Sequence, residues 1–204
     1  MKKIAFVFGI ILSMTTYGQE NDTAKLVVKY GVNDIQLQNL LNFKNIDYFT
    51  IKISGAKIMG KKFAVLSKEY WNGKVSRTDT VTDLSNTPIP GLSRDSLVIT
   101  VLVEKSDPDS MRISFNYDQR FGITKKYKTT VSDKYSMRSL SNGAEHKVKI
   151  GENFPLLVYT LPYENPNYPG ALFYCQLTNE GIPPKDWGEK YKLKHYIVFE
   201  MILY

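Results

Sequence analysis

The residues best suited to bind a ligand lie in two loops near the C-terminal end of the chain. Aromatic rings can stack on the CH-rich faces of sugars, and carboxylates can bind sugar hydroxyl groups. These loops carry both kinds of side chain, and the candidate ligand-binding residues are Tyr163, Glu164, Tyr168, Asp186 and Trp187. A second interpretation stays open, because amphipathic residues such as Tyr163 and Trp187 also close the open ends of protein cores.

No recognisable catalytic motif accompanies these loops. The 204 residues contain no Gly-rich phosphate loop, no His-Glu-x-x-His and no Gly-x-Ser-x-Gly. His195 alternates with apolar residues, which is typical of a buried histidine, and His146 is expected at a solvated turn. A glycoside hydrolase needs two carboxylates roughly 5–10 Å apart. The acids that could converge in this way are Glu152, Glu164, Glu180 and Asp186.

The composition excludes several other classes of site. One cysteine, Cys175, and two histidines cannot form the usual protein zinc sites, so we predict neither a metal nor a cofactor. Cys175 alternates with apolar neighbours and is expected to be a small buried side chain. The net charge is +7, but the lysines are scattered, and the only local cluster is Lys125, Lys126 and Lys128. We therefore expect no nucleic-acid partner; a glycan or an envelope protein is the candidate partner.

The first 18 residues have the pattern of an export signal. A cationic start, Met1-Lys2-Lys3, precedes nine apolar residues, Ile4–Leu12, and a small-polar stretch ending at Gly18. A helix that crosses a bilayer needs roughly 20 apolar residues, so we predict a signal peptide over 1–18. A lipoprotein needs a cysteine immediately after the cut, and none lies near it, which excludes a lipoprotein anchor. We expect the mature chain, 19–204, to be periplasmic or extracellular and not to span a membrane.

Period-two alternation of apolar and polar residues predicts that the mature chain is all-β. Asp47–Ile53 places Phe49, Ile51 and Ile53 on one face. Asn72-Gly73 joins 62–71 to 74–82 and predicts a two-residue hairpin turn. Residues 96–104 are apolar on both faces, which predicts a central strand covered on both sides. Further strands are expected at 111–117, 123–131, 134–140, 146–150, 154–161, 171–178 and 193–203.

These elements predict a single β-sandwich of about 9–11 short strands, of immunoglobulin-like or Greek-key type. Residues 33–43 fit a short helix or an irregular strand, and one helical turn is expected near 183–190, opened by proline. The Pro-rich stretch at 87–92 marks the alternative boundary between two small lobes.

Several short motifs carry a resemblance to a known family. They are Ile46–Phe49, Lys68–Lys74, Asp79-Thr80 and Pro183–Lys190. In these motifs the chain resembles a family of small exported proteins from gut Bacteroides-type bacteria, whose function is not assigned. The resemblance implies an extracytoplasmic β-rich domain and no known activity.

The sequence thus favours a non-enzymatic extracytoplasmic binding or structural protein, and glycan binding is the more specific hypothesis. The alternative is a secreted glycan-active hydrolase. A small outer-membrane β-barrel is a further alternative, but Glu200 interrupts the apolar stripe that its terminal strand would need.

Overall fold

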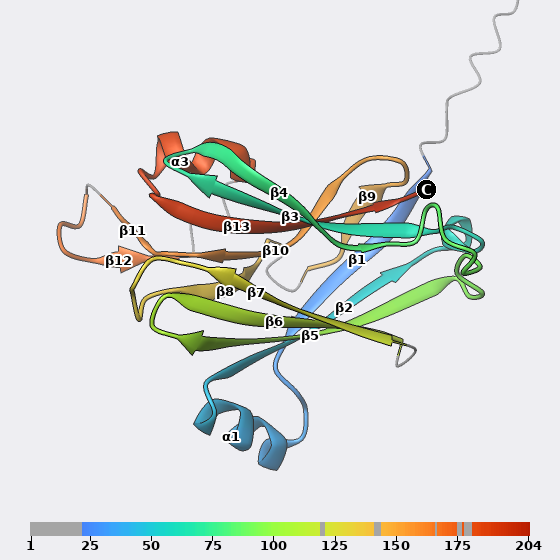
Figure 1. Ribbon diagram of the computed structural model, residues 1–204, viewed down its shortest axis with the longest axis horizontal. Helices are drawn as coiled ribbons and strands as arrows, with labels where there is room; N and C mark the ends of the chain where they lie inside the picture. Colours follow the sequence, from blue (N-terminus) through green and yellow to red (C-terminus); the bar gives the residue numbers. More distant parts are fainter. Residues whose placement is uncertain (1–21, 119–120, 141–143, 166, 175–176, 178–180) are drawn as a thin grey trace, which may run out of the picture.

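Antiparallel strands make up most of the chain, and they form two facing sheets (Figure 1). The computed structural model describes residues 22–118, 121–140, 144–165, 167–174, 177 and 181–204. The predicted leader, Cys175 and Glu180 lie outside these ranges. The two sheets hold six and five strands, and a small ribbon holds two more. The predicted all-β sandwich is confirmed.

The strands follow one another in space in a different order from the sequence. The six-stranded sheet has the order β7 (Phe121–Lys128), β6 (Ser110–Tyr117), β5 (Ser96–Asp107), β2 (Ile46–Ser54), β1 (Thr23–Tyr30) and β9 (His146–Lys149). The five-stranded sheet has the order β4 (Lys74–Asp83), β3 (Phe63–Trp71), β13 (His195–Leu203), β10 (Phe154–Thr160) and β8 (Ser136–Ser139). The ribbon pairs β11 (Tyr163–Glu164) with β12 (Leu172–Phe173). The helical segments are α1 (Ile35–Phe43), η1 (Ala56–Ile58), η2 (Pro184–Asp186) and α3 (Trp187–Lys190).

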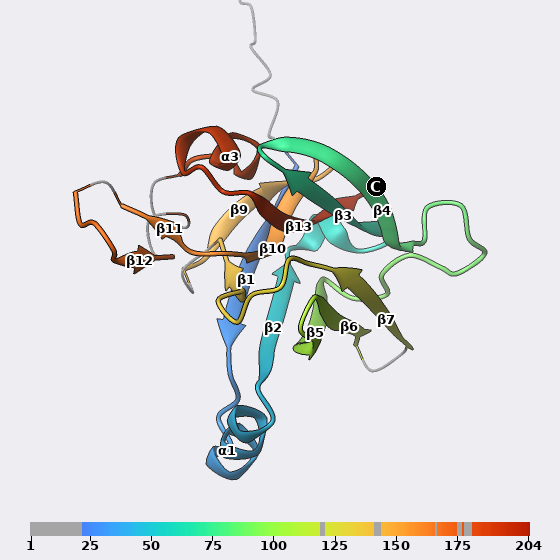
Figure 2. The ribbon, with the colours of Figure 1, turned by 60° about the vertical axis from the view of Figure 1, so that its left-hand side comes forward.

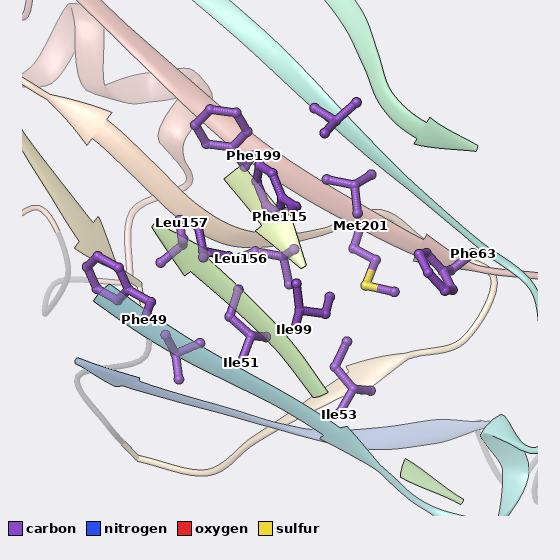
Figure 3. Close-up of a cluster of buried hydrophobic side chains, with 14 of the residues drawn as sticks. Phe49, Ile51, Ile53, Phe63, Ile99, Phe115, Leu156, Leu157, Phe199 and Met201 are labelled. Atoms are coloured by element: carbon purple, nitrogen blue, oxygen red, sulfur yellow. The ribbon is translucent and has the colours of Figure 1, made fainter. Parts of the chain in front are cut away.

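The core between the sheets follows from the alternation of side chains along each strand. Ile51 of β2 and Phe115 of β6 face Phe199 and Met201 of β13 across the sandwich (Figure 3). The ring centroids of Phe115 and Phe199 are 5.5 Å apart. All four side chains are fully buried. This packing fixes which face of β13 points inward, and therefore where His195 lies.

A second apolar cluster covers the outer face of the five-stranded sheet. Tyr70 of β3 stacks on Tyr196 of β13, with ring centroids 4.6 Å apart. Trp187 of α3 lies 5.9 Å from Tyr196 and is fully buried. Its indole Nε1 donates a hydrogen bond to the Ile182 carbonyl at 2.9 Å. At this end α3 forms an outer layer on the five-stranded sheet, and the β11–β12 ribbon extends beyond the end of β10 (Figure 1).

The turn and helix predictions are confirmed. Asn72 and Gly73, between β3 and β4, both have left-handed backbone angles, with φ of 49° and 78°. Two such residues in succession are what a type I′ hairpin turn requires. Residues 33–43 contain the helix α1, and the turn near 183–190 consists of η2 followed by α3.

Two strand predictions need correction. β5 is central and its inner face is buried, but the prediction that it is covered on both sides is wrong. Its outer residues Val98, Thr100 and Leu102 are only half-buried, because they point away from the partner sheet. Apolar content on both faces of a strand therefore did not mean two covering layers.

Of the strand expected at 171–178, Leu172–Phe173 forms among the described residues, while Cys175, Gln176 and Thr178 lie outside them. Tyr174 and Leu177 make side-chain contacts with other parts of the molecule. Tyr174 lies beneath the Arg138 guanidinium, 4.3 Å from the ring centroid, and its hydroxyl donates to the Lys134 carbonyl. Leu177 is buried in the outer cluster.

The Pro-rich stretch at 87–92 is a loop between β4 and β5. Leu84 before it and Leu92 at its end both pack in the core between the sheets. Among the described helices the longest, α1, has nine residues, and none has the length and apolarity needed to cross a bilayer.

Candidate functional site

A cleft with a volume of about 840 Å³ borders the β11–β12 ribbon. One part of its lining comes from the ribbon and its turn, and the other comes from the chain that links α3 to β13. The ribbon contributes Tyr163, Glu164, Asn165, Asn167, Pro169 and Leu172. The α3–β13 link contributes Lys190, Tyr191, Lys192, Leu193 and Lys194. Cationic, amide and apolar groups therefore share one concave surface.

Local hydrogen bonds give the ribbon its shape. The Asn165 side chain accepts from the Asn167 backbone N–H at 2.9 Å, which is an Asx turn. The Glu164 carboxylate accepts from the Gly170 backbone N–H at 2.7 Å and so closes the loop. Gly170 has a φ of 80°, in the left-handed region. Asn165 and residues 167–170 thus lie in a hydrogen-bonded turn region on one side of the cleft.

Aromatic contacts anchor the ribbon to the rest of the molecule. The Tyr163 ring lies 4.7 Å from Tyr191 and 6.2 Å from Phe173, measured between centroids. Tyr163 is buried in the cluster that contains Trp187. The position of the cleft therefore depends on the packing of the outer layer.

The structure separates the five residues predicted to bind a ligand. Tyr163 and Glu164 line the cleft. Tyr168 is 61 % exposed at the ribbon turn and contacts the Phe173 ring, with centroids 6.0 Å apart. Asp186 is exposed beside the buried Trp187. The rings of Tyr163 and Trp187 thus belong to the outer cluster, as the second interpretation of these aromatics expects, and Trp187 presents no surface to a ligand.

The lysines of the cleft were missed in the sequence analysis. Lys190, Lys192 and Lys194 occur at every second position, in the segment Lys-Tyr-Lys-Leu-Lys, and all three line the cleft. This alternation of lysines is the sequence pattern that could have identified them as a cluster. Lys192 has a φ of 56°, so the chain turns there between α3 and β13. The cluster predicted at Lys125, Lys126 and Lys128 lies elsewhere, on the edge strand β7.

A cluster of hydrogen-bonded polar side chains surrounds His195, the buried first residue of β13. Tyr135 Oη is 2.6 Å from His195 Nδ1, and Glu69 Oε1 is 3.2 Å from His195 Nε2. Trp71 Nε1 donates to the same Glu69 oxygen at 2.7 Å. The Trp71 and His195 rings are 4.3 Å apart. The fold thus joins an acid, a histidine and a hydroxyl that are far apart in sequence.

The chemistry of the partners fixes the direction of these hydrogen bonds. The Glu69 carboxylate only accepts, so His195 Nε2 carries the proton and Nδ1 accepts from the Tyr135 hydroxyl. The Tyr135 hydroxyl also contacts Thr130 Oγ1 at 3.0 Å. Burial raises the pKa of Tyr135, which opposes its use as a nucleophile. This cluster ties the 129–135 loop to the five-stranded sheet.

The buried histidine makes the stability depend on pH. Burial lowers the pKa of His195 from its ordinary value of 6.5, while the hydrogen bond and charge of Glu69 act in the opposite direction. The unfolded chain therefore binds this proton at a higher pH than the folded chain does. We expect the free energy of unfolding to fall as the pH is lowered from about 6.5 towards the folded-state pKa. Urea titrations across this range measure the slope.

The control for this prediction is His195→Gln, which removes the titrating group and keeps a polar side chain. Its free energy of unfolding is expected to vary less with pH over the same window. An identical slope in the variant and the wild type would show that another group is responsible.

Within the described part of the chain, His, Cys, Asp and Glu side chains do not gather in threes as a metal site requires. Comparisons of the chain with family models, with curated proteins and with solved structures give no match.

Proposed function

We propose that the protein is a non-enzymatic, exported binding protein whose cleft holds a glycan that carries acidic groups. The observation that carries this proposal is the placement of Lys190, Lys192 and Lys194 in the lining of the 840 Å³ cleft. Ammonium groups bind carboxylate and sulfate groups through charge-assisted hydrogen bonds. The net charge of +7, which becomes +5 when the predicted leader with Lys2 and Lys3 is removed, would attract an anionic polymer to the same surface.

The rest of the lining suits a sugar chain. Asn167 and Glu164 offer groups that bind hydroxyls, while Pro169 and Leu172 offer apolar surface for the CH faces of the rings. The cleft opens on the surface, which allows a polymer to enter without its ends being enclosed. Acidic peptides lack repeated hydroxyl groups and would therefore make fewer hydrogen bonds with this lining.

The same lining favours binding over hydrolysis. Glu164 is the one carboxylate among the described residues that line the cleft, and it already accepts a hydrogen bond from Gly170. Glycoside hydrolysis ordinarily needs an acid and a second carboxylate on opposite sides of the bond that is cut. The hydrolase alternative therefore has less support than the binding function.

Affinity electrophoresis in gels that contain polygalacturonate tests the proposal. The wild-type chain is expected to be retarded by this anionic glycan and not by neutral dextran. The double variant Lys192→Glu/Lys194→Glu replaces two attractive groups with repulsive ones. We expect its affinity for polygalacturonate to be weaker by about tenfold or more.

The matched control is Lys125→Glu/Lys128→Glu, which makes the same change of charge at two exposed positions of β7. It should bind nearly as well as the wild type. Equal weakening of both variants would point to general charge attraction in place of a site. If the gel did not retard the wild-type chain, the proposed binding of an acidic glycan would be contradicted.

A further inference from the structure

Helix α1 projects from the end of β1 and β2, away from both sheets (Figure 2). Its exposed side chains are mostly large and apolar. Ile35 is 70 %, Leu40 54 % and Phe43 79 % exposed, and Leu37 is exposed as well. Single exposed apolar residues are ordinary, but four on nine consecutive residues form a patch that indicates an interaction surface.

Polar side chains stabilise the helix and join it to the chain that precedes it. Gln38 Oε1 accepts from the Val32 backbone N–H at 2.9 Å, and Gln38 Nε2 donates to Asn42 Oδ1 at 2.8 Å. The Asp34 side chain caps the helix by accepting from the N–H groups of Gln36 and Leu37. Leu41 is the one buried residue of the helix.

Apart from Leu41, the apolar side chains of α1 therefore face away from the protein, whereas the apolar side of a surface helix usually faces the core. At about 100° per residue, Ile35, Leu37, Leu40 and Phe43 are spread over about 200° around the helix axis, with the exposed, uncharged Gln36 and Asn39 between them. A groove in a partner protein contacts one side of a helix. Apolar side chains spread over more than half of the circumference fit a medium that surrounds the helix.

The size of the patch argues against a second copy of the chain. A large apolar side chain supplies roughly 60–120 Å² of surface. Four of them supply roughly 500 Å² at most, below the roughly 800 Å² per partner of a stable protein–protein interface. The patch alone is therefore too small to hold a dimer.

The surroundings of the helix match the layers of a membrane surface. No ionisable residue lies between Asp34 and Lys44, so the projecting tip is uncharged. Tyr30, which is exposed, ends β1 just before the helix. Tyrosine and lysine are the residues that favour the headgroup region. Lys44 follows the tip, with its Nζ 5.9 Å from the centroid of the Phe43 ring.

We propose that α1 is a membrane-docking element that inserts Ile35, Leu37, Leu40 and Phe43 into the outer part of a lipid bilayer. Tyr30 and Lys44 then lie at the level of the headgroups. The helix is about 13–14 Å long, so it penetrates one interface and does not cross the bilayer. This inference is independent of the cleft, since it uses other residues.

Flotation with vesicles made of equal parts of phosphatidylcholine and phosphatidylglycerol tests this inference. The chain from Gln19 onward is used, because the apolar leader would bind vesicles by itself. We expect the wild-type chain to float with the vesicles. The variant Leu40→Gln/Phe43→Gln should bind more than about tenfold more weakly, with an unchanged unfolding midpoint, because both side chains are exposed.

The matched control is Val131→Gln, which removes a 77 % exposed apolar side chain from the loop between β7 and β8. It should float as the wild type does. Failure of the wild type to float, or equal flotation of the α1 variant, would overturn the inference. A wild-type dimer that becomes a monomer in the α1 variant, with no flotation of either, would assign the patch to a second copy instead.

Discussion

Replacing Trp187 with alanine is expected to lower the free energy of unfolding by about 3–5 kcal/mol. The side chain is fully buried, and it packs against Tyr196 in the outer cluster. Its removal would leave a cavity beneath α3 and would leave the Ile182 carbonyl without the indole N–H that it accepts. Both losses act on the layer that positions the cleft. Urea unfolding followed by fluorescence or circular dichroism measures the change.

Tyr168→Ala is the matched control, since both residues are candidates in the same pair of loops. Tyr168 is 61 % exposed, so its loss is expected to change the free energy of unfolding by no more than about 0.5 kcal/mol. A Trp187→Ala variant with wild-type stability would contradict the assignment of Trp187 to the core. It would restore this residue as a candidate for direct contact with a ligand.

Gly188→Ala is expected to destabilise the protein by about 1–3 kcal/mol or more. A Cβ atom at position 188 would lie 2.0 Å from Gly73 Cα and 2.3 Å from Gly73 N. These are backbone atoms of the β3–β4 turn, and Gly73 is itself fixed there by its φ of 78°. Helix propensity alone predicts the opposite sign, because alanine is about 1 kcal/mol better than glycine within a helix. The sign of the measured change therefore distinguishes close approach from propensity.

The comparison variant is Gly122→Ala on the edge strand β7. A Cβ atom there would meet Asn116 Oδ1 at 2.4 Å, and the next contact is at 3.5 Å. Because the Asn116 side chain can rotate away, we expect a change within about 0.5 kcal/mol of zero. Equal losses from the two substitutions, or a gain from Gly188→Ala, would show that α3 and the hairpin can separate at little cost.

Much of the fold could be predicted from local patterns. The alternation at Phe49, Ile51 and Ile53 gives the inner face of β2 directly, since the pleat repeats every two residues. Asn72-Gly73 identifies the β3–β4 hairpin, because both residues tolerate a positive φ. Alternation over 171–178 predicts a longer strand than the described residues form there. Among them only Leu172–Phe173 pair, and Tyr174 and Leu177 make tertiary contacts that no local pattern indicates.

The site was harder to predict because it depends on contacts between distant segments. Glu69 and His195 are 126 residues apart, and no local pattern indicates that they meet. The burial of Trp187, which lies in α3, depends on Tyr70 of β3 and Tyr196 of β13. Alternation in the segment Lys190–Lys194 was visible, but only the fold places it beside the β11–β12 ribbon.

The most direct test of the proposed function is an NMR titration of the isotope-labelled chain with short oligogalacturonates. The proposal predicts that the backbone amide signals that shift most belong to Lys190–Lys194 and to Glu164, Asn165, Asn167 and Leu172, which line the cleft. Signals from Lys125 and Lys128 on β7 should stay in place. Shifts centred on β7 or on another face, or no shifts at saturating concentrations, would contradict the assignment of the cleft as the binding site.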